Sequence, residues 1–145
     1  MKQGVIIMNM KRLSIGSVVG LVALYILGFL IWQMVFTDFF AANAGSAEGV
    51  VREPPILWAI ALGTLFYAVL LTLAIESQSG AKSLATGLKV GAVVGFLLWG
   101  TADFVLFGFQ NTSNLTATIA DAVLEGIRGG IGGAIIAVVL SKVGD

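Results

Sequence analysis

Two long apolar stretches near the C-terminus decide the fold of this chain. They read LATGLKVGAVVGFLLWGTADFVLF at residues 84–107 and LTATIADAVLEGIRGGIGGAIIAVVL at residues 115–140. Each is long enough to cross a membrane, because a spanning helix takes about 20 mostly apolar residues. Each also carries charges that hydrocarbon disfavours, and such charges usually face the interior of a helix bundle. We therefore expect this pair of helices to form the centre of the protein.

The composition of the whole chain indicates an integral membrane protein. Its 145 residues are 58% hydrophobic and 11% charged, whereas soluble domains carry about 25% charged residues. The formal net charge is zero and no basic run is present, which argues against a nucleic-acid partner. Because the sequence has neither cysteine nor histidine, it offers no disulfide framework and none of the common zinc, copper or haem ligands. We expect no metal and no cofactor.

The hydrophobic pattern predicts an all-α fold, a bundle of four transmembrane helices in a single membrane domain. The predicted helices cover residues 15–36, 56–75, 84–107 and 115–140. Pro54 and Pro55 suit the entrance of the second helix, and Asn114 is expected to cap the fourth. The loop at residues 38–55 has room for a short interfacial helix. The short loop at residues 110–114 predicts a tight hairpin between the last two helices.

The distribution of basic residues predicts the orientation of the chain. On one side of the predicted bundle lie Lys2, Lys11, Arg12, Lys82 and Lys142, whereas Arg52 stands alone on the other. Because Lys and Arg accumulate in cytoplasmic loops, we expect both termini in the cytoplasm and a multi-pass protein of the inner membrane.

Glycines recur at four-residue spacing on three of the predicted helices. They are Gly16 and Gly20, then Gly87, Gly91 and Gly95, then Gly126 and Gly130, and finally Gly133, which follows Gly129 by four residues. Such small residues let helix backbones approach closely in lipid, where van der Waals packing drives helix association. We expect them to pack the helices together. Since there are more of them than four helices need, we also expect a homo-oligomer or contact with subunits of a membrane complex in the bilayer.

A short internal similarity suggests a repeat. Gly28-Phe-Leu-Ile-Trp32 reappears as Gly95-Phe-Leu-Leu-Trp99. One interpretation is a duplication that gives two repeated helical hairpins with the same orientation in the membrane. The other is coincidence, because glycine and leucine match easily in apolar helices. The sequence alone leaves both open.

The charges of the last two helices form a candidate site. Asp121, Glu125 and Arg128 share one helix face because they are spaced i, i+4 and i+7. Asp103 and Asp121 are both expected about 7–10 Å below the outer surface, so a tight hairpin would let them meet. Three carboxylates then face one guanidinium. We expect at least one carboxyl to be protonated near neutral pH, or a cation or water-filled vestibule to compensate.

Three interpretations of this cluster stand beside one another. The first is a structural lock in which Arg128 pairs with Glu125 or Asp121 and fixes the helix register. The second is a proton- or cation-coupled site, and the third is a solvated outer cavity with ordinary acids. Trp99 lies one turn from Asp103 on the same face, with Thr101 beside it. Both are candidates for a cavity wall, although tryptophan near a membrane boundary also serves as an anchor.

The segment from Gly91 to Ile136 resembles a family of small bacterial four-helix membrane proteins of unknown function. Their third helix reads approximately G-x-x-x-G-x-x-x-Y-x-T-Y-D-L, and their fourth opens V-D-x-x-W-G. Matching positions here are Gly91, Gly95, Thr101, Asp103, Asp121 and Gly126. Ala102, the Phe104-Val-Leu-Phe run and Glu125 depart from that pattern. The resemblance implies a four-helix fold with an aspartate pair between the last two helices, and it implies no activity.

Two functions fit the sequence. No nucleophile–base constellation and no phosphate loop is present, so an enzyme is not expected. The first hypothesis is a small accessory or assembly subunit that packs against itself or against a membrane complex. The second is a minimal proton- or ion-coupled transporter or channel that uses the carboxylate and arginine cluster.

Overall fold

The computed structural model describes residues 9–144, and they contain helices and no β-strand. Lys2, used in the topology prediction, lies outside these residues. The elements are α1 (Met10–Gly28), the π-helix η1 (Phe29–Val35), α2 (Thr37–Ala42), α3 (Leu57–Glu76), α4 (Leu84–Phe109) and α5 (Leu115–Leu140). The predicted all-α class is confirmed. Four spans, the first made of α1 and η1 together, are long and apolar enough to cross a membrane.

The helix ends follow local capping. The fourth helix covers residues 115–140 as predicted, and the Asn114 side chain accepts a hydrogen bond from the backbone of Ala117. The first helix begins at Met10, five residues before the predicted start, because the Asn9 side chain accepts from the backbone N–H groups of Lys11 and Arg12. The outer part of this span is a π-helix, which the sequence pattern did not predict.

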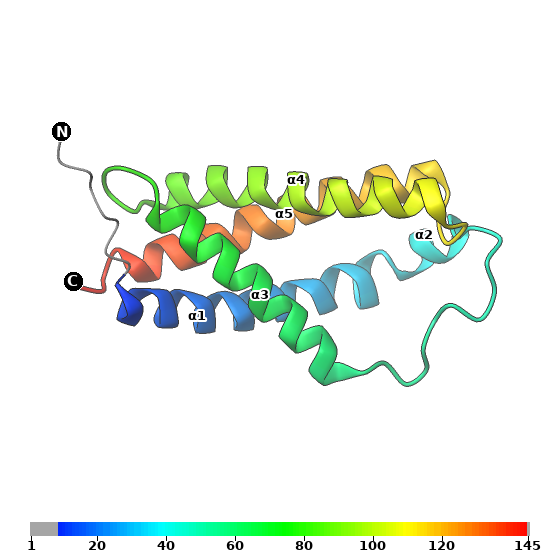
Figure 1. Ribbon diagram of the computed structural model, residues 1–145, viewed down its shortest axis with the longest axis horizontal. Coiled ribbons are helices and arrows are strands. Elements are labelled where there is room, and N and C mark those ends of the chain that lie inside the picture. The colour runs from blue at the N-terminus through cyan, green and yellow to red at the C-terminus, as the bar shows by residue number, and fades with distance from the viewer. Residues whose placement is uncertain (1–8, 145) are drawn as a thin grey trace.

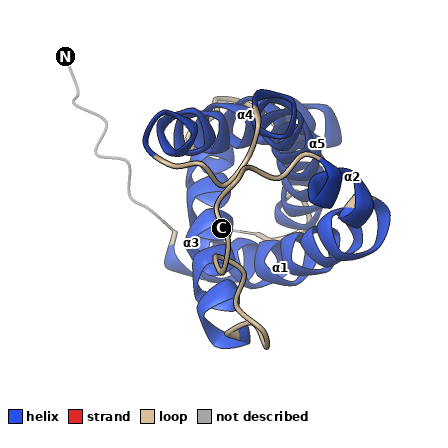
Figure 2. Cartoon of the chain, turned by 90° about the vertical axis from the view of Figure 1, so that its right-hand side faces the viewer, coloured by secondary structure: helices blue, strands red, loops and turns tan. Residues whose placement is uncertain are grey.

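The four long helices run side by side along the length of the molecule (Figure 1). Viewed along that axis, they surround a common centre, with α4 beside α5 (Figure 2). α5 is the most buried of the four, whereas α4 turns most of its surface outward. α3 crosses the bundle obliquely, so that its beginning lies away from α4 and α5 (Figure 1).

Backbone contact joins α4 to α5. Gly87, Gly91 and Gly95 on α4 face the backbone of Gly133, Gly129 and Glu125 on α5, respectively. A Cβ atom at any of these three α4 positions would overlap a carbonyl group of α5. The two helices therefore approach more closely than any residue with a side chain would allow, as small-xxx-small contacts do in membranes.

The other predicted packing glycines fill two further roles. Gly16 faces Thr72 of α3, and Gly20 faces Ala68 of α3 and Ile136 of α5. These two positions seat α1 against its neighbours. Gly126 and Gly130 lie at the flank of the α4–α5 contact, where a Cβ atom would lie 3.3 Å from the nearest α4 side-chain atoms.

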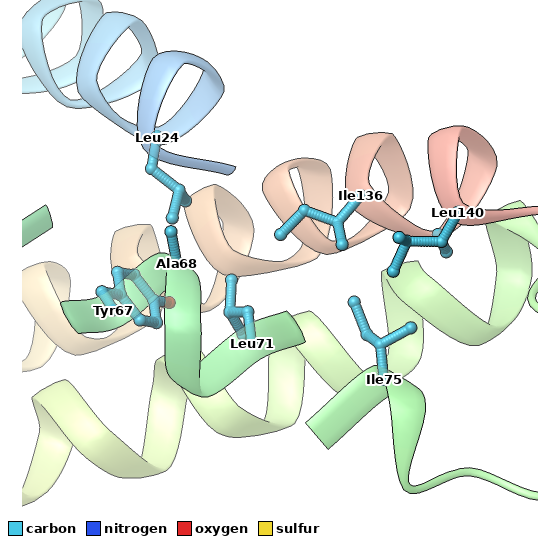
Figure 3. Packing of buried hydrophobic residues seen from close by; sticks show 8 residues of the cluster. Leu24, Tyr67, Ala68, Leu71, Ile75, Ile136 and Leu140 are labelled. Atoms are coloured by element: carbon cyan, nitrogen blue, oxygen red, sulfur yellow. The ribbon is translucent and has the colours of Figure 1, made fainter. Parts of the chain in front are cut away.

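The apolar core fills the half of the bundle that carries both termini. It consists of Leu24 from α1, Tyr67, Ala68, Leu71 and Ile75 from α3, and Ile136, Ala137 and Leu140 from α5. Their side chains point toward one another between the three helices (Figure 3). Such interdigitated packing leaves little room for solvent, so this half of the bundle is closed.

An ion pair fastens the end beyond this core. The Arg12 guanidinium donates two hydrogen bonds to Glu76, at 2.9 and 3.1 Å, and a third to the Val143 carbonyl. It thereby ties the beginning of α1 to the end of α3 and to the C-terminal segment. Glu76 is therefore a paired charge, with its side chain 26% exposed.

The opposite end is closed on one side by its loops. The backbone of Gly45 donates to the Thr112 carbonyl at 3.0 Å, and that of Ala47 donates to the Asn111 carbonyl at 2.9 Å. Asn114 also bonds Asn43 through backbone and side chain. The segment after α2 thus covers the α4–α5 turn. The long connection within the first hairpin of the suggested repeat therefore differs from the short turn within the second. The duplication stays a prediction.

We predict that Gly91→Ala lowers the free energy of unfolding by about 1–3 kcal/mol, because the new methyl group must push two helix backbones apart. Thermal unfolding in mild detergent measures the loss. Gly63→Ala on α3 is the matched control, since no atom lies within 4 Å of a Cβ atom there. Equal stability of the two variants would contradict backbone contact between α4 and α5.

Candidate functional site

The charged cluster lies in the middle of the bundle on the inward face of α5. Arg128 stands thirteen residues after the first residue of α5, which places it about 20 Å along the helix. α5 has 26 residues and is about 39 Å long, so Arg128 lies near the middle of the helix, with Glu125 and Asp121 on successive turns toward its N-terminal end.

Arg128 is positioned by two hydrogen bonds and two aromatic rings. Its Nη1 donates to Glu125 Oε1 at 2.9 Å, and its Nε donates to the Leu24 carbonyl at 3.0 Å. The guanidinium also lies over the rings of Trp32 and Tyr67, with its Cζ 5.4 and 5.7 Å from their centroids. Both Arg128 and Glu125 are buried. This is the pairing that the structural-lock interpretation requires, with Glu125 as the partner.

Asp121 and Asp103 have no such cationic partner. Asp121 Oδ1 accepts a hydrogen bond of 2.6 Å from the indole Nε1 of Trp32. Asp103 lies across the hairpin on α4, and both carboxyls line a cavity of about 180 Å³ together with Thr112, Ser113 and Thr118. Asp103 Oδ2 is buried and has no hydrogen-bond partner. Among the described residues, neither aspartate takes part in an ion pair.

A larger cavity of about 410 Å³ lies on the other side of Asp121. Its wall combines aromatic, apolar and charged side chains from all four spans. The lining residues are Tyr25, Gly28, Phe29, Trp32, Gln33, Pro55, Leu57, Ile60, Thr64, Trp99, Asp121, Glu125 and Arg128. Because Gln33, Pro55 and Leu57 lie near the outer ends of their elements, this central cavity extends toward the end of the bundle opposite the termini.

Buried polar atoms without partners gather around the same place. Among the described residues, they include Glu125 Oε2, Trp99 Nε1 and the Tyr67 hydroxyl. Burying a polar atom without a hydrogen bond is costly, so native proteins rarely do it. Glu125 and Trp99 line the central cavity, although these two unpartnered atoms are themselves covered by neighbouring groups.

The structure separates the two predicted wall residues. Trp99 lines the central cavity, and its ring contacts that of Tyr67 edge to face at 6.4 Å. Thr101 is exposed, its hydroxyl donates to the Leu97 carbonyl, and it lines neither cavity. That part of the prediction was wrong, because two residues along a helix rotate the side chain by about 200°.

Sequence reasoning missed Trp32 and Tyr67. Trp32 donates a hydrogen bond to Asp121, and its ring lies against Arg128. The repeated pentapeptide was the available signal, because its two tryptophans, Trp32 and Trp99, line the same cavity. Nothing in the sequence around Tyr67 distinguishes it from an ordinary core aromatic residue.

The described part of the chain holds no group of three or more carboxylates arranged to bind a metal ion. The cluster is therefore best described as an arginine–glutamate pair beside two aspartates. Comparison with protein families, curated proteins and solved structures gives no match. The resemblance to the small bacterial four-helix proteins stays a prediction, and the site must be interpreted from its own geometry.

We predict that Arg128→Met lowers the free energy of unfolding by about 3–5 kcal/mol, because it leaves Glu125 buried without its countercharge. The double variant Glu125→Gln/Arg128→Met should recover most of this loss, since it removes both charges. Thermal unfolding of the three proteins in the same detergent provides the comparison. Equal losses in the single and double variants would mean that packing, rather than the ion pair, fixes Arg128.

Proposed function

We propose that this chain is a small transporter of the inner membrane that couples the binding of protons or cations at its acidic cluster to the movement of a solute. The observation that carries the proposal is the charge balance of the site. Arg128 neutralises Glu125. Within the described residues, no basic side chain forms an ion pair with Asp103 or Asp121. The carboxyl groups of Asp103 and Asp121 are therefore left without a countercharge inside the proposed membrane spans.

Asp103 and Asp121 lie deep in the bundle, which makes two unpaired negative charges costly. Asp103 precedes the end of α4 by six residues, and Asp121 follows the start of α5 by six, so each lies about 9 Å from its helix end. Ionised carboxylates at such depth are costly, and they typically mark proton or ion pathways. The groups that interact with these two aspartates are each other, Trp32 of η1, and Glu125 and Arg128 of α5. Binding a proton or a cation would relieve the excess negative charge.

Among the described residues, the central cavity lies toward one end of the bundle. The central cavity reaches the outer ends of η1 and α3, whereas the glycine contact, the apolar core and the Arg12–Glu76 pair close the other end. Transporters that work by alternating access hold their site near the middle of the membrane and expose it to one side at a time. This one-sided access supports transport rather than a continuous pore.

We further propose that the closed end faces the cytoplasm. Lys11, Arg12 and Lys82 lie there together with the C-terminal segment, because their side chains bond Gly144, Glu76 and Gln78. Arg52 belongs to the loop at the other end. This distribution follows the positive-inside rule, so the central cavity would open toward the periplasm.

A shallow groove on the outer flank supports the second candidate function, an accessory or assembly subunit. Its lining is apolar with small residues in the floor, and comprises Leu88, Ala92, Phe96, Val123, Gly126, Ile127, Gly130 and Ile131. A helix of a second copy or of another subunit could approach closely there.

We predict for this second function that a complex purified in mild detergent is lost when Ala92→Leu fills the groove. Native gel electrophoresis or light scattering measures the size of the complex. Ala59→Leu on the exposed face of α3 is the matched control and should leave it intact. A complex that survives Ala92→Leu unchanged would exclude the groove as its interface.

We predict for transport that the purified protein, reconstituted into liposomes with an entrapped pH indicator, speeds the decay of an imposed pH gradient. Asp121→Asn should reduce this rate to that of protein-free liposomes, because an amide cannot take up and release a proton near neutral pH. The decay rate of the indicator signal is the measurement.

Asp38→Asn is the control for this experiment, since Asp38 is an exposed aspartate of α2 outside both cavities. Its rate should equal that of the unmodified protein. Circular dichroism and gel filtration would show that Asp121→Asn remains folded. A folded Asp121→Asn protein that carries protons at the original rate would refute the proposed role of the cluster.

A further inference from the structure

We propose that the central cavity binds a small amphipathic organic cation, that is, an alkylammonium group joined to an apolar part. This inference rests on the proposed transport function and specifies the class of solute. Three independent features of the cavity support it: the sign of its charge, the engagement of its arginine, and the composition of its wall.

The charge of the wall favours a cation. Asp121 and Glu125 line the cavity together with Arg128, which leaves one net negative charge when all three are ionised. Glu125 is only 3% exposed, and its Oε2 has no hydrogen-bond partner in the described structure. Positive charge in the adjoining cavity stabilises such a buried carboxylate through electrostatic attraction, even without direct contact.

Arg128 is poorly placed to attract an anion instead. Its Nη1 and Nε already donate to Glu125 and to the Leu24 carbonyl. The rings of Trp32 and Tyr67 lie against the guanidinium. An anion would find only Nη2 outside these hydrogen bonds, and it would have to approach two carboxylates, which repel it.

The remaining wall suits the apolar part of such a solute. Tyr25, Phe29, Trp32 and Trp99 contribute aromatic surface, and Leu57 and Ile60 add aliphatic surface. Aromatic faces attract quaternary and primary ammonium groups through their quadrupoles. A volume of about 410 Å³ lies in the range of about 300–1,000 Å³ typical of small-molecule sites. A hydrated metal ion would use little of this surface.

The test uses phenyltrimethylammonium and its uncharged isostere tert-butylbenzene, which differ in charge but hardly in shape. The protein carries Trp58→Phe, because Trp58 is exposed and outside the cavity. Its remaining tryptophans, Trp32 and Trp99, then report on the cavity alone. Titration in an uncharged maltoside detergent, without any ion gradient, should give a saturable change in fluorescence. The cation should bind at least about tenfold more tightly than the isostere.

Two substitutions test the source of this preference. Glu125→Gln and Asp121→Asn should each weaken binding of the cation by about tenfold or more and leave binding of tert-butylbenzene unchanged. Tyr25→Leu removes aromatic wall without touching the charges, so it should weaken binding of both compounds. Circular dichroism of each variant shows whether the fold is retained.

The ammonium group could belong to a free solute or to a lipid headgroup. Competition with a soluble short-chain phosphatidylcholine separates these sources, because a headgroup site would release phenyltrimethylammonium and a site for free amines would retain it. Either result supports an ammonium site and identifies where its ligand comes from.

Equal affinity for the cation and its isostere would overturn the inference, as would cation binding that survives in the Glu125→Gln/Asp121→Asn double variant. Because the titration needs no transport, the two proposals fail separately. Cation binding without any flux in liposomes would refute transport and retain the cation site. Proton flux without cation binding would refute the cation site and retain transport.

Discussion

The backbone contact between α4 and α5 is the constraint on which the rest of the structure depends. Gly87, Gly91 and Gly95 bring the two helices together without intervening side chains. This closeness places Asp103 across the hairpin from Asp121, and it leaves the face of α5 that carries Asp121, Glu125 and Arg128 turned toward α1 and α3. Helices held apart by larger residues would separate the aspartates and weaken the enclosure of the ion pair. The packing of α4 on α5 thus determines the electrostatics of the site.

The π-helix η1 is the second element that shapes the cluster. A π-turn holds one more residue than an α-turn, so it rotates the side chains that follow, and such segments occur often at functional sites. Here η1 contains Trp32, whose indole bonds Asp121 and whose ring lies against Arg128. Gly28, directly before η1, leaves space for the guanidinium, since a Cβ atom there would lie 3.0 Å from Arg128 Nη2. The span made of α1 and η1 therefore contacts both Arg128 and Asp121.

The sequence predicted the helices and the α5 part of the site because both follow from simple periodicities. Apolar runs of about 20 residues determine the spans, and the i, i+4, i+7 spacing places Asp121, Glu125 and Arg128 on one face whatever the rest of the fold does. The contributions of Trp32 and Tyr67 could not be predicted in this way, because they depend on how α1 and α3 are rotated against α5. Thr101 is a different case, because helix periodicity alone turns it about 200° away from Trp99, which lines the cavity.

The repeated pentapeptide connects these observations. Gly28 and Gly95 both face the charged turns of α5, the first at the Arg128 guanidinium and the second at the Glu125 backbone. Four residues after each glycine, Trp32 and Trp99 line the central cavity. In each segment the glycine lies close to α5 and the tryptophan lines the cavity. The two segments therefore share a local role, although the helices around them are connected differently. Their indoles are not equivalent, because Trp32 Nε1 bonds Asp121 whereas Trp99 Nε1 has no partner. The two indoles therefore differ in role although both line the cavity, because one is bonded to the acidic cluster and the other is buried without a partner.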